Sequence, residues 1–201
     1  MSPASSDLRC VISTINALPS DFLGILDILV NDVAVPVFCR NIVLLLILGT
    51  ISDEKIAADV ALHFWYSAFI PAEYRFRISV ALISFLKHDL HVFPLGPHST
   101  LSSCIPPNAK EYFLHIFQSA MYKMNNDDRV RSVPSHWNYK DRMYVGLKPS
   151  HRGAFQEYSH FRIVLPFGAM NAHFNCPNLS LFSLDVKWLQ NDYANPLAGW
   201  E

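Results

Sequence analysis

An aspartate and a histidine four residues apart, Asp59 and His63, are the side chains whose types and spacing most directly suggest acid–base chemistry. On a helix these positions share one face, so the carboxylate can orient the imidazole and favour its protonated form, as the partner of a general base does. Lys55 and Tyr66 extend this pair into a narrow polar stripe. The alternative is that the stripe faces water without any role in chemistry, because a surface ion pair contributes under about 1 kcal/mol.

The helix predicted to carry the polar stripe is otherwise apolar. At about 100° per residue, the alanine, isoleucine, valine and aromatic side chains between Ile56 and Phe69 cover roughly two thirds of its circumference. A helix of this kind must be nearly enclosed by the rest of the protein. The question for the site is therefore whether the stripe faces solvent or a cleft.

A second set of candidate ligands lies in a proline-rich loop. His88, His91, His98 and Cys104 could in principle close a tetrahedral zinc site. Their spacing matches no zinc finger, and surface histidines in such a loop need no metal. We therefore predict no metal site and keep a zinc-binding module as a minor alternative.

Signatures of known enzyme chemistry are missing from the sequence. There is no GxGxxG, GxSxG or HExxH motif and no P-loop lysine, and the chain has only seven glycines. The four cysteines are far apart and form no CxxC pair, which favours reduced thiols over a disulfide framework or a zinc ribbon.

Composition restricts the class of protein. The chain has 201 residues, 51% of them hydrophobic and 16% charged, with a formal net charge of −1. We expect one domain over 1–201 with a large core or an apolar surface for a partner. Without a concentrated basic face, nucleic acid binding is not expected.

The sequence predicts neither a membrane protein nor a secreted one. The longest apolar run, Ile42–Leu48, has seven residues, whereas a membrane-spanning helix needs roughly 18 to 20. The first ten residues show no basic segment followed by an apolar one. A cytoplasmic location is the expectation.

Periodicity and turn residues predict a helix-rich α/β fold. Helices are expected at 7–18, 36–49, 53–70, 72–88 and 108–123 and around 149–158. The run "ILDILVND" at 25–32 predicts a buried strand, and "FRIVLPFG" and "LSLFSL" predict a short C-terminal β-hairpin. The proline-rich loop at 89–107 is a possible internal seam.

Several ordered blocks resemble one family. The segments "DLRCVISTINALP", "ILVNDVAVPVFCRNIVLLLILG" and "LHFWYSAFIPAEY", followed by "LKPSHR", "VLPFG", "CPNLSLF" and "NPLAGW", resemble an uncharacterised fungal domain family related to the N-terminal domain of the axonemal dynein assembly factors. The resemblance covers most of the chain. It implies an incomplete Rossmann-like domain, similar to S-adenosylmethionine-dependent methyltransferases, in a family without established catalysis.

The resemblance also assigns a role to one acidic residue. It places Asp32 at the end of the second strand, where such enzymes bind the cofactor ribose through a carboxylate. The alternative is that Asp32 caps the helix begun by Pro36. Family members carry an upstream strand and a glycine where this chain has Ser6, so we expect the cofactor-binding edge to be absent, either in a short paralogue or in a fragment.

Two functions follow from these patterns. The first is a non-catalytic interaction or assembly-type domain, whose unpaired sheet edge and apolar composition favour a protein partner or self-association, with no cofactor. The second is a methyltransferase-like enzyme or binder of S-adenosylmethionine that uses Asp32, with the polar stripe nearby.

Overall fold

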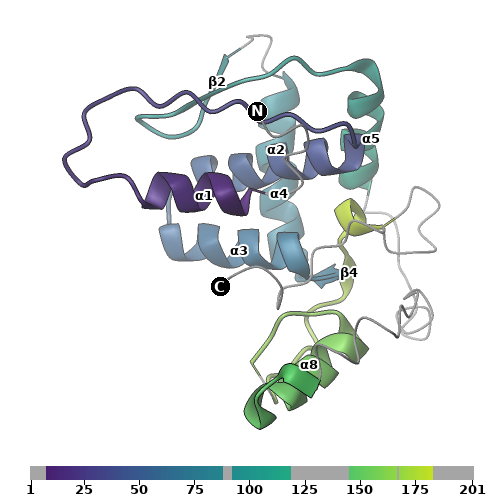
Figure 1. The fold of residues 1–201 in the computed structure, drawn as a ribbon. Helices are drawn as coiled ribbons and strands as arrows, with labels where there is room; N and C mark the ends of the chain where they lie inside the picture. Colours follow the sequence, from purple (N-terminus) through teal and green to yellow (C-terminus); the bar gives the residue numbers. More distant parts are fainter. Residues whose placement is uncertain (1–7, 88–91, 119–144, 167, 183–201) are drawn as a thin grey trace.

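The structure is a computed structural model that describes residues 8–87, 92–118, 145–166 and 168–182. Figure 1 shows a group of packed helices with a further helix, α8, lying apart from it. In chain order the elements are α1 (Arg9–Asn16), α2 (Val35–Thr50), α3 (Glu54–Tyr66), β1 (Phe69–Ile70), α4 (Ala72–Lys87), β2 (Val92–Pro94), β3 (Thr100–Ser102), α5 (Pro107–Gln118), α8 (Pro149–Phe161), β4 (Cys176–Pro177) and the 3-10 helix η2 (Leu179–Leu181). The helices predicted from the sequence are confirmed within these ranges, except that the helix predicted at 53–70 ends at Tyr66 and the last two residues of that range form β1.

Helix α2 is the centre of the fold. Pro36 occupies its first turn, where the missing N–H costs no hydrogen bond, and an almost unbroken apolar run follows. The helix contacts α3, α4 and α5, and a helix that is apolar on nearly all sides must be buried in this way. Gly49 lies inside α2 rather than after its end, and a Cβ there would meet the Leu95 side chain at 2.7 Å. Its lack of a side chain lets the segment between β2 and β3 approach α2 closely.

The strands in the described ranges form two small sheets. β1 pairs with β4 and β2 pairs with β3, both antiparallel. The predicted mixture of helices and strands is present. Because no strands pair in parallel within the described ranges, the predicted Rossmann-like arrangement is not confirmed. The loop predicted at 89–107 contains the β2–β3 hairpin.

The predicted C-terminal β-hairpin is wrong for the residues that the structure describes there. Residues 162–166 have no regular secondary structure, and Leu179–Leu181 is a 3-10 helix. The strand that does form, β4, pairs with β1 more than 100 residues earlier. Sequence pattern indicates where a strand can form, but it does not select the partner strand.

The strand predicted at 25–32 is also wrong. Those residues connect α1 to α2 without strand pairing to any described residue, and most of them are exposed, with Val30 and Asp32 half-buried. We call residues 22–33 the arm, and in Figure 1 they run in the long loop that projects to the left of the helices. A β-rich sequence becomes a strand only where a neighbouring strand accepts its backbone hydrogen bonds.

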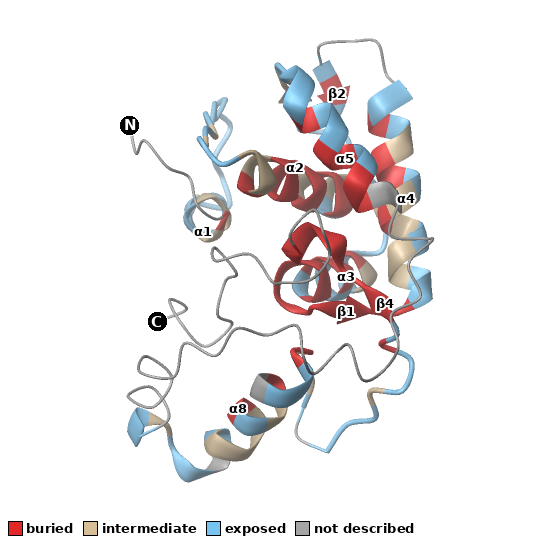
Figure 2. Cartoon of the chain, turned by 90° about the vertical axis from the view of Figure 1, so that its right-hand side faces the viewer, coloured by how far each residue is buried: buried red, intermediate tan, exposed pale blue. Residues whose placement is uncertain are grey.

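Two hydrophobic cores hold the described residues together. The larger one joins α2, α3, α4, α5 and β2, and the smaller one joins β1 and η2 with Ile163 and Phe174. Figure 2 shows buried residues concentrated in α2, α3, β1 and β4, whereas α8 is largely intermediate or exposed. Across the residues searched, the helices are too short or too polar to cross a bilayer.

Candidate functional site

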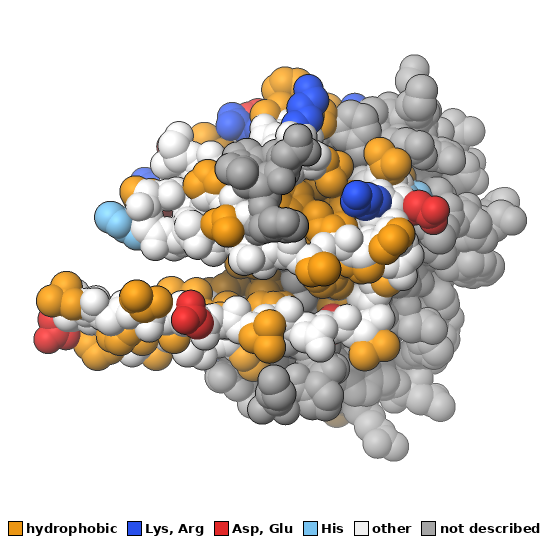
Figure 3. All heavy atoms as spheres, turned by 90° about the horizontal axis from the view of Figure 1, so that it is seen from above, with side chains coloured by type: hydrophobic (Ala, Val, Ile, Leu, Met, Phe, Trp, Pro, Cys, Tyr) orange, Lys and Arg blue, Asp and Glu red, His pale blue; other side chains and the backbone are white. Residues whose placement is uncertain are grey.

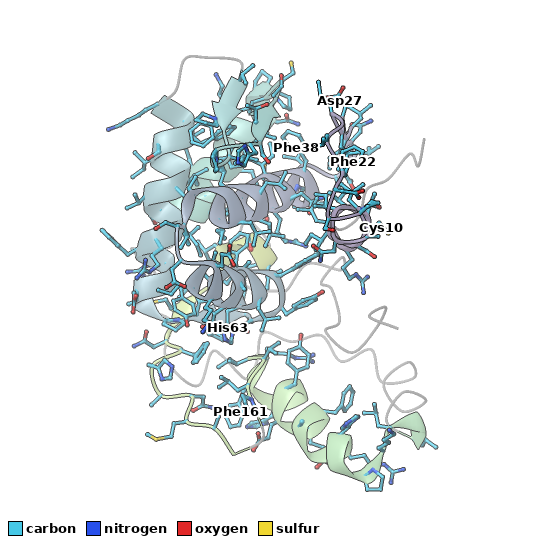
Figure 4. All side chains as sticks on the ribbon, turned by 90° about the vertical axis from the view of Figure 1, so that its left-hand side faces the viewer. Cys10, Phe22, Asp27, Phe38, His63 and Phe161 are labelled. Atoms are coloured by element: carbon cyan, nitrogen blue, oxygen red, sulfur yellow. The ribbon has the colours of Figure 1, made fainter. Side chains whose placement is uncertain are left out.

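The polar stripe runs from solvent into the protein rather than along one exposed face. Lys55 is exposed and Asp59 is half exposed, with a side-chain exposure of 49%. His63 and Tyr66 are buried, at 5% and 1% exposure. Figure 4 shows His63 on the side of α3 that is turned toward the segment containing Phe161.

The buried imidazole of His63 is held on three sides. Its Nδ1 lies 3.0 Å from the Ser67 hydroxyl, one helical turn further on. Its Nε2 lies 3.7 Å from the nearer carboxylate oxygen of Asp59, which is beyond hydrogen-bond length. The ring packs against Phe174 at a centroid distance of 4.8 Å and against Tyr74 at 5.8 Å.

The hydrogen bonds of Ser67 assign the tautomer of His63. The Ser67 hydroxyl oxygen accepts a hydrogen bond of 3.0 Å from the backbone N–H of Val164, and the residue is fully buried. Because a buried hydroxyl proton needs an acceptor, it is donated to Nδ1 of His63. The ring proton therefore lies on Nε2, directed toward Asp59.

Burial lowers the pKa of His63 below its usual value of 6.5. Asp59 raises it in part, and His173 lowers it further. Burial dominates because Asp59 is half exposed and lies too far away for a hydrogen bond to the ring. Asp59 therefore favours the protonated imidazole, as predicted, but burial outweighs this effect and the net pKa shift of His63 is downward.

Tyr74 is a member of the site that the sequence did not predict. Its hydroxyl donates to the other carboxylate oxygen of Asp59, across from α4 to α3. Burial and then this hydrogen bond raise the pKa of Tyr74 to about 12. Asp59 thus lies between Tyr74 and His63, and it forms a hydrogen bond with Tyr74 only.

Asp59, His63 and Ser67 have the connectivity of a charge-relay triad but not its accessibility. In such a triad the serine oxygen attacks a bound substrate while histidine takes its proton. Here the Ser67 oxygen is fully buried and already accepts the Val164 N–H, so no substrate atom can reach it. In this conformation the arrangement fixes residue 164 against the end of α3.

The spacing 59, 63 and 67 would have identified Ser67 from sequence, since all three lie on one helical face. Tyr74, Val164 and Phe174 come from other parts of the chain and carried no such signal.

Tyr66, predicted to share the site, stacks on Trp65 with a centroid distance of 5.3 Å, and its backbone oxygen accepts from the Tyr158 hydroxyl.

Next to this site, the segment of β4 and η2 is bound to three helices by buried polar groups. The Asn178 amide donates to the backbone oxygens of Phe64 and Ser67 at 2.7 and 2.9 Å. The Ser180 backbone oxygen accepts from the Arg40 guanidinium and the Tyr112 hydroxyl. These residues carry no local signal in the sequence, because Asn178 lies 114 positions from Phe64.

Asp32 precedes α2 but does not cap it. One carboxylate oxygen accepts from the Ala34 N–H at 2.8 Å, and the N-cap residue itself is Ala34. The other oxygen is buried and has no hydrogen-bond partner among the described residues. The part of the arm before Asp32 forms no strand with any described residue, so the structure described here lacks the strand end that a ribose-binding carboxylate occupies.

The proposed zinc ligands are only partly described. His88 and His91 lie outside the described residues, whereas His98 and Cys104 are exposed near the β2–β3 hairpin. Within the part of the chain that was searched, no three histidine, cysteine or acidic side chains come together in a way that could hold a metal ion.

Two buried histidines predict that acid destabilises the fold. Burial lowers the pKa of His63 and of His115, the latter against an opposing hydrogen bond with the Leu179 backbone. Below pH 6.5 the unfolded chain binds more protons than the folded one, so the free energy of unfolding should fall, by up to about 1.4 kcal/mol per pH unit for each histidine.

Denaturant titrations from about pH 5 to about pH 8 test this expectation. His63→Gln should flatten the acid side of the profile, while His98→Gln, at an exposed position, should leave it unchanged. A wild-type stability that stays constant or rises as the pH falls below 6.5 would contradict the burial argument.

Comparison with known proteins identifies one relationship. Residues 1–70 match the family model described as "Domain of unknown function (DUF4470)". The match spans α1, the arm, α2 and α3 and ends in β1. This confirms the similarity to an uncharacterised domain family over that part of the chain. No curated protein and no solved structure shows a significant match.

Proposed function

We propose that the protein is a non-catalytic interaction domain that binds another polypeptide through the arm. The observation that carries this proposal is the exposure of large apolar side chains on a segment whose backbone has no backbone partner among the described residues. Leu23, Ile25, Leu29 and Val33 are 98%, 91%, 75% and 89% exposed. Several large aliphatic side chains exposed together on one short segment mark a binding surface rather than ordinary surface composition.

The backbone of the arm supports binding by strand addition. Within the described part of the chain, the N–H and C=O groups of residues 23–33 make no hydrogen bond to another backbone group. An extended segment of this kind gains affinity by pairing with a strand of another chain, while alternate side chains enter its pockets. The "ILDILV" sequence has the β-branched and leucine content that favours such pairing.

The geometry around His63 supports a role without catalysis. Its serine is fully buried and its imidazole packs against Phe174, so both groups stabilise the fold rather than face a ligand. The resemblance to the dynein assembly factor domains suggests an assembly-type role in the cytoplasm, and we include that relationship and location in the proposal.

Binding of S-adenosylmethionine is the second candidate, and one observation favours it. The buried oxygen of Asp32 without a hydrogen-bond partner is an acceptor that a ribose hydroxyl could satisfy. The rest of the surroundings fit poorly, because the other oxygen is engaged by Ala34 and no strand precedes the residue. We therefore derive no reaction step through this cofactor.

Photo-cross-linking in the cells that make the protein tests the proposed function. Replacing Ile25 with benzoylphenylalanine should give a covalent protein adduct, because this side chain is 91% exposed in the unbound fold and would lie in the interface. The matched control is Phe76 on α4, 69% exposed, where the same replacement should give no adduct. Equal labelling at the two positions would contradict the proposal.

A further inference from the structure

Between Ile25 and Val33, the outward side chains of the arm form an apolar–polar pattern that is symmetric about Leu29, while Leu23, which is 98% exposed, lies outside this pattern. From Ile25 to Val33, every second residue points away from the body, as the exposures show. In order, these side chains are Ile25, Asp27, Leu29, Asn31 and Val33. The sequence alternates apolar and polar residues symmetrically about Leu29, with a carboxylate on one side and an amide on the other.

We propose that the arm pairs with the arm of a second copy of this chain, as two antiparallel strands related by a two-fold axis at Leu29. This deepens the proposed function by naming its partner, and it rests on that function. With the axis at Leu29, Ile25 lies opposite the partner's Val33 and Asp27 lies opposite the partner's Asn31. Each apolar side chain then meets an apolar one, and each carboxylate meets an amide donor.

A two-fold axis explains the symmetry of the pattern. In such a dimer the same patch must complement itself, so residues equally distant from the axis have to match each other. A strand that binds an unrelated protein has no need for this symmetry. On the inner face Ile28 falls opposite the partner's Val30, and only Leu26, which falls opposite the partner's Asp32, is mismatched.

The less exposed side chains of the arm, which form its inner face, attach the arm to the rest of the protein. Val30 packs against the large core, whereas Phe22, Leu26 and Ile28 are only 43%, 41% and 40% exposed. The arm therefore lies with one side toward the body and the other toward solvent. Figure 4 shows Phe22 and Asp27 on the same side of the molecule as Cys10 of α1.

The edge of the arm is open to another strand. Figure 3, which views the molecule from above, shows the arm as the lower projection with apolar side chains along it and a hollow between it and the rest of the surface. The backbone groups of residues 23–33, which have no backbone partner in the described ranges, supply the donors and acceptors of a ladder.

The arm has apolar side chains available for such an interface, because Leu23, Ile25, Leu29 and Val33 are each at least 75% exposed in one chain.

Site-specific cysteines test the two-fold axis directly. Opposite residues of an antiparallel pair have Cβ atoms about 4.5 to 5.5 Å apart, so Leu29→Cys places two thiols within reach of each other. The two copies of Ile25 would be on the order of 27 Å apart at 3.4 Å per residue. In a background with exposed Cys10 and Cys104 changed to serine, oxidised glutathione should cross-link Leu29→Cys into a dimer and leave Ile25→Cys monomeric.

Light scattering tests the interface without a new thiol. Wild type should have twice the chain mass of 22.8 kDa, and Leu29→Lys should weaken dimerisation about tenfold or more, because it places two ammonium groups at the axis. Leu29 is 75% exposed within one chain, so its replacement should not disturb the monomer fold. Phe76→Lys, at another exposed apolar position, should leave the dimer intact.

Two results would overturn self-pairing. One is a monomeric wild type at every accessible concentration, and the other is equal cross-linking of Leu29→Cys and Ile25→Cys. The benzoylphenylalanine experiment at Ile25 distinguishes a failure of self-pairing from a failure of the proposed interaction function. An adduct with a mass other than two chains would retain an interaction domain with a different partner, whereas the absence of any adduct would remove both.

Discussion

Asn178→Ala is expected to lower the free energy of unfolding by about 3 to 5 kcal/mol, a large part of the 5 to 15 kcal/mol that stabilises an ordinary domain. Asn178 is 3% exposed, and every polar atom of its side chain is used. Its removal would leave the backbone oxygens of Phe64 and Ser67 and the hydroxyl of Ser180 without their partner. Each such buried group costs about 1 to 3 kcal/mol.

The effect is large because Asn178 completes the end of α3. The last four carbonyl oxygens of a helix have no partner within it. The N–H of Ala68, which would follow in the helix, instead donates to the Arg162 oxygen. The side-chain amide of Asn178 replaces the Ala68 N–H as the donor to the Phe64 oxygen, and it also donates to the Ser67 oxygen. The backbone N–H of Asn178 donates to the Ala68 oxygen at 2.8 Å.

Chemical denaturation of Asn178→Ala and Asn175→Ala measures this contribution. Asn175 is three residues earlier and exposed, so its loss should change stability by no more than about 0.5 kcal/mol. Asn178→Asp keeps the acceptor for Ser180 but loses both donors and buries a charge, so it should be at least as destabilising as the alanine variant. A loss below about 1 kcal/mol for Asn178→Ala would show that the segment is not anchored by these bonds.

The helices could be predicted because their causes are local. Apolar periodicity and the Pro36 turn determine α2, and Asp53 caps α3 by accepting the N–H groups of Lys55 and Ile56 at 3.0 Å. These signals lie within one or two turns of the residues that they affect. The strands could not be predicted in the same way, since β1 and β4 are paired across more than 100 residues.

The arm shows where propensity alone misleads. Its side chains differ in exposure, with Ile25 and Leu29 at 91% and 75% and Leu26 at 41%, but the predicted strand does not form. Its burial was predicted wrongly because burial depends on a partner strand. Apolar residues on both faces of an extended segment indicate that something covers it, without indicating whether the cover comes from the same chain.

The candidate site was predicted in part. The spacing of Asp59 and His63 correctly placed them on one face of α3. Burial of the imidazole depends on Phe174 and that of Ser67 on the segment at residue 164, and both are distant in sequence. Because desolvation decides the pKa of His63, the direction of its shift could not follow from the neighbouring residues alone.

Phe113→Ala on α5 is expected to cost about 3 to 5 kcal/mol, the usual loss for a fully buried phenylalanine. Phe113 is 0% exposed, and its ring meets Phe85 of α4 edge-on at a centroid distance of 6.2 Å. Phe85 in turn meets Phe93 of β2 at 5.5 Å. Three rings thus join the elements before, within and after the loop at 89–107, and edge-to-face contacts add to the energy of burial.

Leu114→Ala provides the matched control, since its side chain is 52% exposed on the same helix and should cost under about 1 kcal/mol. Denaturation should be followed with two probes, far-ultraviolet circular dichroism and tryptophan fluorescence, the latter including Trp65 in the large core. Because the aromatic contacts connect both sides of the 89–107 loop, wild type and Phe113→Ala should each unfold in one transition that is the same for both probes. A variant in which α5 melts separately, with α2, α3 and α4 retaining their stability, would place a structural boundary at that loop and contradict a shared core.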